Sequence, residues 1–282
     1  HVYHHYRLLP KAYILPKYTK DSPEVAKACE KMNSELGANI TLDFSPNTEV
    51  VDSSVISQWI TVDDNMQVTF NQDAVKQYIA DLAAKYDTVG KTRNFTTATG
   101  NVVQVEGGGY GWKIDQDAEA AQLTEEIRTG TQTTREPVYS MRANSYGYND
   151  IGSTYIEVDL SSQHMYYYQN GSIIFDSDIV SGDIRYDDRA TPPGIFTLYY
   201  KKSPDVLRGE KKPDGTYEYE TQVTYWMPFN GGIGFHDATW QAYFGGDRYT
   251  YAGSHGCINM PLDAAATLYS IIDTNVPIVC FY

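Results

Sequence analysis

Basic charge, cysteine and long apolar runs are all scarce in this sequence. Its 282 residues include 22 Lys and Arg against 36 Asp and Glu, a formal net charge of −14. Binding to nucleic acid requires a cationic surface, so no nucleic acid partner is expected. No apolar run approaches the roughly 18 residues that a membrane-spanning helix needs, so we expect no membrane span in this chain. The hydrophobic fraction of 41% is typical of a globular protein, which excludes wholesale disorder.

The three cysteines are too few for a disulfide scaffold, and their number is odd. A bridge between Cys29 and Cys280 would leave Cys257 as a candidate reactive thiol. Both Cys29 and Cys280 also suit the alternative of inert, buried side chains. The chain starts at His1 without a charged-then-apolar leader, so we expect any export signal or anchor to lie outside this sequence. We interpret the histidines at positions 1, 4 and 5 as part of a chain terminus rather than a metal site.

The first half has the pattern of an α+β domain. Ser22-Pro23-Glu24 predicts a helix start, with Ser as N-cap and Pro in the first turn. Apolar residues alternate from Ile40 to Phe44 and predict a short strand, and further helices are expected from Asn71 and Asp115. A polar stretch then predicts a boundary, and we assign residues 1–149 to this first domain.

From Ser153 the pattern changes to short strands. Asn170-Gly171 predicts a hairpin turn between two of them, and Val223 to Met227 predicts a later one. One short helix is expected from Pro261. Closely spaced strands with few helices indicate a sandwich or a partly closed barrel, so residues 150–282 are predicted to form a mainly-β domain.

The most informative segment is Ser254-His255-Gly256-Cys257-Ile258-Asn259. Small residues around Cys257 allow the backbone to turn sharply, and the amides of His255, Gly256 and Cys257 could converge on a developing oxyanion. The predicted helix that follows would favour the thiolate form of Cys257. These features are typical of a nucleophilic cysteine in acyl transfer.

Such a cysteine needs a histidine as its base. His236 is the better candidate, because it ends the apolar strand that starts at Ile233 and a strand end holds a side chain rigidly. His255 could line the site, whereas His164 has no obvious partner. The neighbouring Asp237 could orient the base or could be simple surface charge. A zinc site made of the candidate base, His255 and the cysteine lacks the usual ligand spacing, so we predict no metal.

Three motifs resemble the L,D-transpeptidase catalytic domain, the YkuD-like family: Thr191-Pro192-Pro193-Gly194, Ile233-Gly234-Phe235-His236 and Ser254-His255-Gly256-Cys257-Ile258-Asn259. The resemblance covers the chain from about Ser153 to its end. The first half, including Tyr110-Gly111-Trp112, resembles a peptidoglycan-binding domain that precedes this catalytic domain in some relatives. The implied fold is an α+β N-terminal domain followed by a mainly-β L,D-transpeptidase catalytic domain.

The resemblance implies an extracytoplasmic bacterial enzyme of cell-wall biogenesis that works without a cofactor. Cys257 would attack the third residue of a tetrapeptide stem and expel the terminal D-Ala, with His236 as general base. Backbone amides at His255, Gly256 and Cys257 would hold the oxyanion. A neighbouring stem would then resolve the thioester into a 3→3 cross-link. Carbapenems, which acylate the family's cysteine, are expected to acylate Cys257.

Several points stay open at the level of sequence. An L,D-carboxypeptidase would use the same residues, and a catalytically silent wall-binding protein would retain the fold. Many relatives carry arginine where this chain has Asn259, a predicted substrate-binding residue. Tyr225, Trp226 and Tyr243 could form a substrate groove or could pack in the core. The histidine could be held by Ser254 or by the backbone of the residue that follows it.

Overall fold

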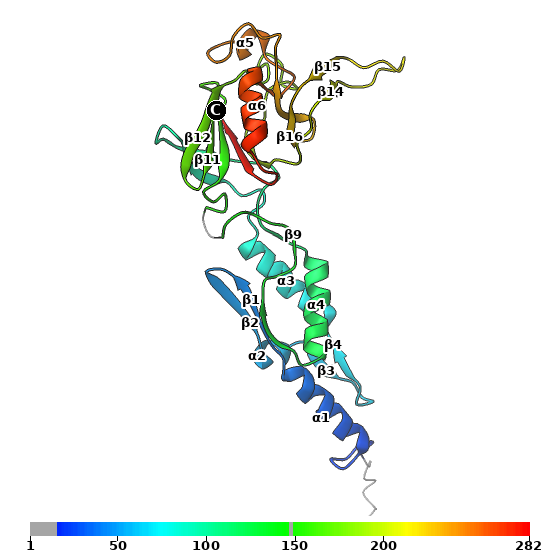
Figure 1. Cartoon of the computed structure of the whole chain (residues 1–282). Coiled ribbons are helices and arrows are strands. Elements are labelled where there is room, and N and C mark those ends of the chain that lie inside the picture. The colour runs from blue at the N-terminus through cyan, green and yellow to red at the C-terminus, as the bar shows by residue number, and fades with distance from the viewer. Residues whose placement is uncertain (1–15, 147–148) are drawn as a thin grey trace, which may run out of the picture. The chain divides into compact units, whose positions relative to one another are not determined.

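The computed structural model describes residues 16–146 and 149–282 and divides the chain into two compact units (Figure 1). The N-terminal histidines at positions 1, 4 and 5 lie outside the described residues. The first unit ends at Pro137 but leaves out the segment Asp81–Asp115, which belongs to the second unit together with Val138–Tyr282. The units therefore alternate along the chain. The predicted boundary between residues 149 and 150 stays a prediction.

The first unit combines helices with short strands, as the sequence predicted. Helix α1 (Pro23–Leu36) begins at the predicted start, and β1 (Asn39–Phe44) pairs in parallel with β8 (Gln132–Arg135). The other elements are β2 (Asn47–Val51), α2 (Ser53–Ile56), β3 (Ile60–Val62), β4 (Val68–Phe70), α4 (Gln116–Arg128) and the first part of α3 (Gln72–Tyr86), which continues into the second unit from Asp81. Fully buried side chains include Ile40, Leu42, Val75, Ile79, Leu123 and Ile127.

The second unit contains a five-stranded sheet with the order β12-β11-β10-β19-β13. Its strands are β10 (Tyr155–Asp159), β11 (His164–Gln169), β12 (Ser172–Asp178), β13 (Gly194–Thr197) and β19 (Pro277–Phe281). β10 and β19 are parallel, and the other neighbours are antiparallel. The predicted turn at Asn170-Gly171 joins β11 to β12 with positive φ angles of 51° and 81°.

A second sheet, with the order β16-β17-β18, carries the candidate site. Its strands are β16 (Trp226–Asn230), β17 (Ile233–Asp237) and β18 (Ile258–Met260). One buried cluster joins side chains of both sheets and of α6 (Leu262–Ile271): Ile156, Val158, Phe196, Met227, Phe235, Ile258 and Leu268. This core fixes the second sheet against the first. No helix in the described part of the chain is long and apolar enough to cross a membrane.

The strand predicted over Val223–Met227 is wrong. In the structure β15 (Glu220–Val223) ends there and pairs with β14 (Asp205–Arg208), and β16 begins three residues later. The Asp237 carboxylate accepts hydrogen bonds from the amides of Thr224 and Tyr225 at 2.8 and 2.7 Å. Because these amides are taken by a side chain, they are not available to continue a ladder.

The segment 81–115 packs against the β-domain. It contains the hairpin of β5 (Arg93–Thr96) with β6 (Val102–Val105), and β7 (Lys113–Ile114), which pairs with β9 (Tyr139–Met141). A buried cluster combines aromatic and aliphatic side chains of both parts: Phe95, Val105, Tyr110, Trp112, Ile195, Val279 and Phe281. A Cβ on Gly108, where φ is +82°, would lie 2.0 Å from the Ile195 carbonyl oxygen, so this contact requires glycine.

A buried carboxylate, Glu157 of β10, joins the same hairpin to the sheet. Both of its oxygens accept from the Ala98 amide, at 2.9 and 3.0 Å, and the residue is 1% exposed. Burial raises the pKa of Glu157 from 4.5 to about 7. Between these two values the folded state binds the proton more tightly than the unfolded chain. The contribution of Glu157 to stability is therefore fully present below about pH 4.5, falls as the pH rises to about 7, and is constant above it.

We expect Glu157→Gln to remove this pH dependence, since glutamine stays neutral and still offers an acceptor to Ala98. The free energy of unfolding of the variant should exceed that of the wild type above pH 7 by up to roughly 3 kcal/mol. Urea unfolding of the second unit between pH 5 and 8 measures the effect. Glu106→Gln, an exposed carboxylate after the same hairpin, is the control. Parallel pH profiles for the wild type and Glu157→Gln would contradict the expectation.

Candidate active site

Two adjacent strands bring the candidate residues together. β17 and β18 are parallel, with His236 opposite Asn259 and Phe235 opposite Ile258. Cys257 directly precedes β18. Since side chains alternate along a strand, the positions before and after Ile258 face the side on which His236 lies. The sheet therefore places the predicted base, the predicted nucleophile and the predicted substrate residue on one face.

The loop before Cys257 is held by two hydroxyl groups. Ser254 Oγ donates to the Cys257 carbonyl at 2.6 Å and accepts from the Gly256 amide at 3.0 Å. The buried Thr191, from the predicted breaker before β13, donates through Oγ1 to the Gly256 carbonyl at 2.7 Å and accepts from the Gly182 amide at 2.9 Å. Gly256 has a φ of +112°, which favours glycine. Ser254 thus shapes the loop rather than holding the histidine.

The backbone of Asp237 holds His236. The ring nitrogen Nδ1 lies 2.9 Å from the Asp237 carbonyl oxygen, and the residue is 4% exposed. A carbonyl oxygen only accepts hydrogen bonds, so Nδ1 carries the proton and Nε2 keeps its lone pair. Burial lowers the pKa of His236, although this hydrogen bond opposes the shift. At neutral pH the ring is therefore a neutral imidazole that can accept a proton.

Cys257 carries a buried thiol that stays protonated at neutral pH. It is 8% exposed and packs beside Val223 and Trp226, and its Sγ lies 3.5 Å from the Gly232 carbonyl oxygen. Burial raises the pKa of this thiol to about 11. The sequence-based expectation of a thiolate favoured by the following helix is wrong, because β18 separates Cys257 from α6. The resting thiol keeps its proton, and a base must remove it.

Two backbone amides next to the thiol in sequence have no acceptor and are candidate donors to an anion. Among the residues that the structure describes, no acceptor is hydrogen-bonded to the amides of His255 and Cys257. The expected contribution of the Gly256 amide is wrong, since Ser254 Oγ already accepts from it. An oxyanion near Cys257 would therefore have two candidate donors rather than three.

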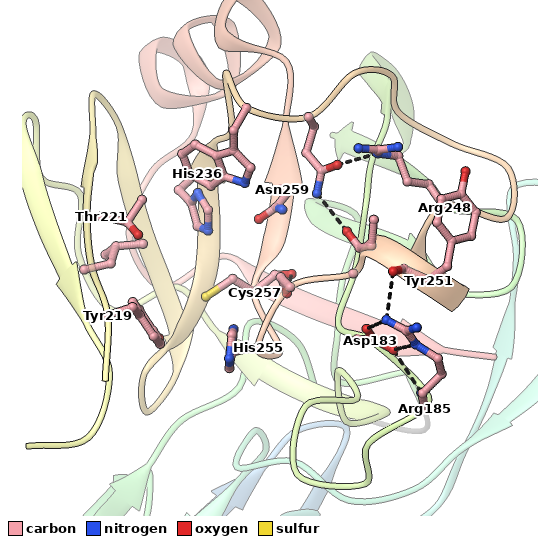
Figure 2. Close-up of a pocket in the computed structure, with 16 residues that line it drawn as sticks. Asp183, Arg185, Tyr219, Thr221, His236, Arg248, Tyr251, His255, Cys257 and Asn259 are labelled. Carbon is pink, nitrogen blue, oxygen red and sulfur yellow. Dashed lines mark hydrogen bonds and ion pairs between the residues drawn. The ribbon is translucent and has the colours of Figure 1, made fainter. Parts of the chain in front are cut away.

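These residues line a cavity of about 440 Å³. Figure 2 shows the Cys257 sulfur projecting between the rings of His236 and His255. One side of the cavity comes from the β14–β15 hairpin, where Tyr219 lies with its ring centroid 5.0 Å from that of His255. On the other side Figure 2 shows charged and aromatic residues: Asp183, Arg185, Arg248 and Tyr251. Trp240 and Gln241 also line the cavity. The cavity thus surrounds the thiol with both apolar and polar groups.

The predicted substrate residues do not all reach this cavity. Asn259 lines it, is 1% exposed, and its Oδ1 has no hydrogen-bond partner among the described residues. Trp226 is 6% exposed behind Cys257 and does not line it. Tyr225 packs on the ring of Tyr269 at 5.1 Å, so the core-packing alternative holds for these two aromatics. Tyr243 lies outside the lining residues, against Arg248.

Sequence reasoning missed the hairpin and the charged side of the cavity. Thr221 lies in β15 and Tyr219 directly precedes it, and eleven residues of irregular chain (209–219) separate β15 from its partner strand β14. No short motif marks such a pairing. Arg248 lies just before α5 (Tyr249–Ala252), a single helical turn that no pattern predicts. A signal for Trp240 existed, since it follows the predicted base by only four residues.

Within residues 16–146 and 149–282, no group of three or more His, Cys, Asp and Glu side chains is arranged to hold a metal ion. The zinc alternative built on His236, His255 and Cys257 therefore gains no support from the geometry. The site is a thiol, an imidazole and a set of hydrogen-bond donors.

Known protein families and solved structures are similar to this chain over most of its length. Residues 153–280 match the L,D-transpeptidase catalytic domain family, and residues 18–135 match a family described as "Putative peptidoglycan binding domain". No curated protein matches the chain. A crystal structure of a cysteine-to-serine variant of Enterococcus faecium L,D-transpeptidase is 34% identical, covering 90% of this chain and 100% of that one, with a TM-score of 0.71. The Ldtfm–avibactam carbamoyl enzyme is also 34% identical, over 91% of this chain and 98% of that one, with a TM-score of 0.72. The chain therefore belongs to the L,D-transpeptidase family of acyltransferases.

Proposed function

We propose that this chain is a cysteine-dependent L,D-transpeptidase that forms 3→3 cross-links between peptidoglycan stem peptides through a thioester. The strongest support is that a protonated thiol, Cys257, and an imidazole with a free Nε2, His236, line one cavity. Neither group is reactive alone at neutral pH, but the pair can act together. Family membership supports the same reaction class.

The first half-reaction transfers an acyl group to the enzyme. His236 Nε2 takes the Cys257 proton as the sulfur attacks the carbonyl carbon of the third stem residue. The amides of His255 and Cys257 stabilise the negative oxygen of the tetrahedral intermediate. The C–N bond to the terminal D-Ala then breaks, and the imidazolium returns the proton to the leaving nitrogen. Free D-Ala departs and a thioester remains.

The second half-reaction releases the enzyme. The side-chain amine of an acceptor stem attacks the thioester carbonyl, and His236 takes a proton from that amine. Breaking of the C–S bond regenerates Cys257, which recovers the proton. An amide between two stems is the product. If water attacked instead, the same residues would give a carboxypeptidase.

Incubation of the protein with tetrapeptide stems and an added amine acceptor tests this proposal. We expect release of D-Ala and formation of a cross-linked dimer, both detected by mass spectrometry. Tripeptide without dimer would contradict the transferase and support the carboxypeptidase. Absence of any product, together with no covalent adduct, would support a catalytically silent wall-binding protein.

The same thiol is the proposed target of inhibitors. Ldtfm forms a carbamoyl enzyme with avibactam. We propose that avibactam and carbapenems acylate Cys257 in this chain, because it is the thiol beside a base and a pair of free amides. Peptidoglycan as substrate implies an extracytoplasmic place of action at the cell wall. The match of residues 18–135 supports a role for the first domain in binding peptidoglycan or positioning the enzyme on it.

A further inference from the structure

Arg248 is a cation held at the charged side of the cavity. It lines the cavity together with Cys257 and Asn259, and it is half-buried. Its Nε donates to Gln241 Oε1, an interaction drawn as a dashed line in Figure 2. Its guanidinium carbon lies 4.8 Å from the ring centroid of Tyr243. The ring of Tyr251 lies on it as well, at 5.9 Å. These contacts fix the orientation of a side chain that is otherwise flexible.

Arg248 has no carboxylate partner among residues 16–146 and 149–282. The other arginine of the cavity, Arg185, donates to the Asp183 carboxylate at 2.6 Å and to the Tyr251 carbonyl at 2.8 Å. For Arg248, no Asp or Glu among the residues described lies within ion-pair distance. In a chain of net charge −14, an oriented and uncompensated cation in a concave site is a binding position for an anion.

The cavity also contains an acceptor without a donor. Asn259 Oδ1 is buried and has no partner in the described part of the chain. Leaving a buried acceptor unsatisfied has a cost that a bound donor would remove. A cation and a free acceptor together complement a group that carries both a carboxylate and an N–H. The C-terminal residue of a peptide is such a group.

We infer that Arg248 recognises the C-terminal carboxylate of the donor stem, while Asn259 accepts from a peptide N–H of the same stem. This inference rests on the proposed function. When Cys257 attacks the third residue of a tetrapeptide, the terminal carboxylate lies one residue away, at most about 3.6 Å further along the chain. That anion must therefore enter the cavity that Arg248 lines. A planar guanidinium can bind it with two parallel hydrogen bonds. Arg248 is thus a specificity-determining residue for stems that end directly after the attacked carbonyl.

Two donor substrates distinguish carboxylate recognition by Arg248 from a general structural role of this residue. One is a tetrapeptide stem with a free C-terminal carboxylate, and the other is the same stem with a C-terminal carboxamide. For the wild type we expect kcat/KM to be about 10- to 100-fold higher for the free acid, the range of a hydrogen-bonded charge. Arg248→Gln should lower kcat/KM for the acid by that factor and leave the carboxamide nearly unchanged. Arg248→Lys should keep part of the preference, since lysine keeps the positive charge but cannot form the two parallel hydrogen bonds of a guanidinium.

Arg208→Gln is the matched control. Arg208 pairs with Glu220 on the hairpin and does not line the cavity, so the preference should survive its loss. An equal loss for both donors in Arg248→Gln, or a wild type without preference, would overturn the role of Arg248 and leave the proposed function standing. A wild type that releases D-Ala or alaninamide from neither donor would instead overturn the proposed function and this inference with it.

Discussion

Cys257→Ala is expected to abolish both cross-linking and the covalent adduct with a carbapenem. Alanine has no nucleophilic atom, and no neighbouring side chain can substitute for the sulfur beside His236. The fold should survive the change, because the side chain packs at the edge of a small cluster with Val223 and Trp226. Intact-mass spectrometry after incubation with a carbapenem measures the adduct directly, and circular dichroism checks the fold.

The two other cysteines make this experiment specific. Cys29 is exposed on α1, so it is the thiol that an indiscriminate reagent would reach first. Cys280 is fully buried in β19. We expect Cys29→Ala to form the adduct as the wild type does. If the adduct persisted in Cys257→Ala and disappeared in Cys29→Ala, the assignment of the nucleophile would be wrong.

His236→Gln is expected to slow acylation by about 10²- to 10⁴-fold at neutral pH, the usual contribution of a general base. The physical reason is the buried thiol, whose pKa is about 11. Without a base, the reaction depends on the small thiolate fraction, which grows about tenfold per pH unit below that pKa. The acylation rate of His236→Gln should therefore increase toward that of the wild type as the pH rises. The wild type should show a nearly flat profile above the pKa of His236, which burial holds below its ordinary value.

The measurement is the rate of adduct formation between pH 6 and 10. His164→Gln is the control, because this histidine lies on β11 between Asp176 and Asp178 and outside the cavity. Its rate profile should match that of the wild type. A constant rate deficit of His236→Gln across the whole pH range would point to a structural role for the ring instead of proton transfer.

The proposed catalytic pair could be selected from sequence because each member carries a local signal. Cys257 lies among small residues that allow a sharp turn, and His236 ends an apolar strand. The protonation state of the pair could not be predicted in this way. It depends on burial by Val223 and Trp226, which precede Cys257 by more than thirty residues.

The sequence alone determined the order of the domains, the mainly-β character of the second half, and the two candidates proposed as nucleophile and base. These follow from patterns a few residues long, which act on the local backbone. Only the tertiary structure decided that Ser254 holds the loop, that the Gly256 amide donates a hydrogen bond to Ser254 Oγ, and that Tyr225 packs away from the site. It also brought Tyr219 and Arg248 into one cavity with the sulfur. Such placements depend on which distant segments share a core, and that is set by the packing of the whole chain rather than by neighbours in sequence.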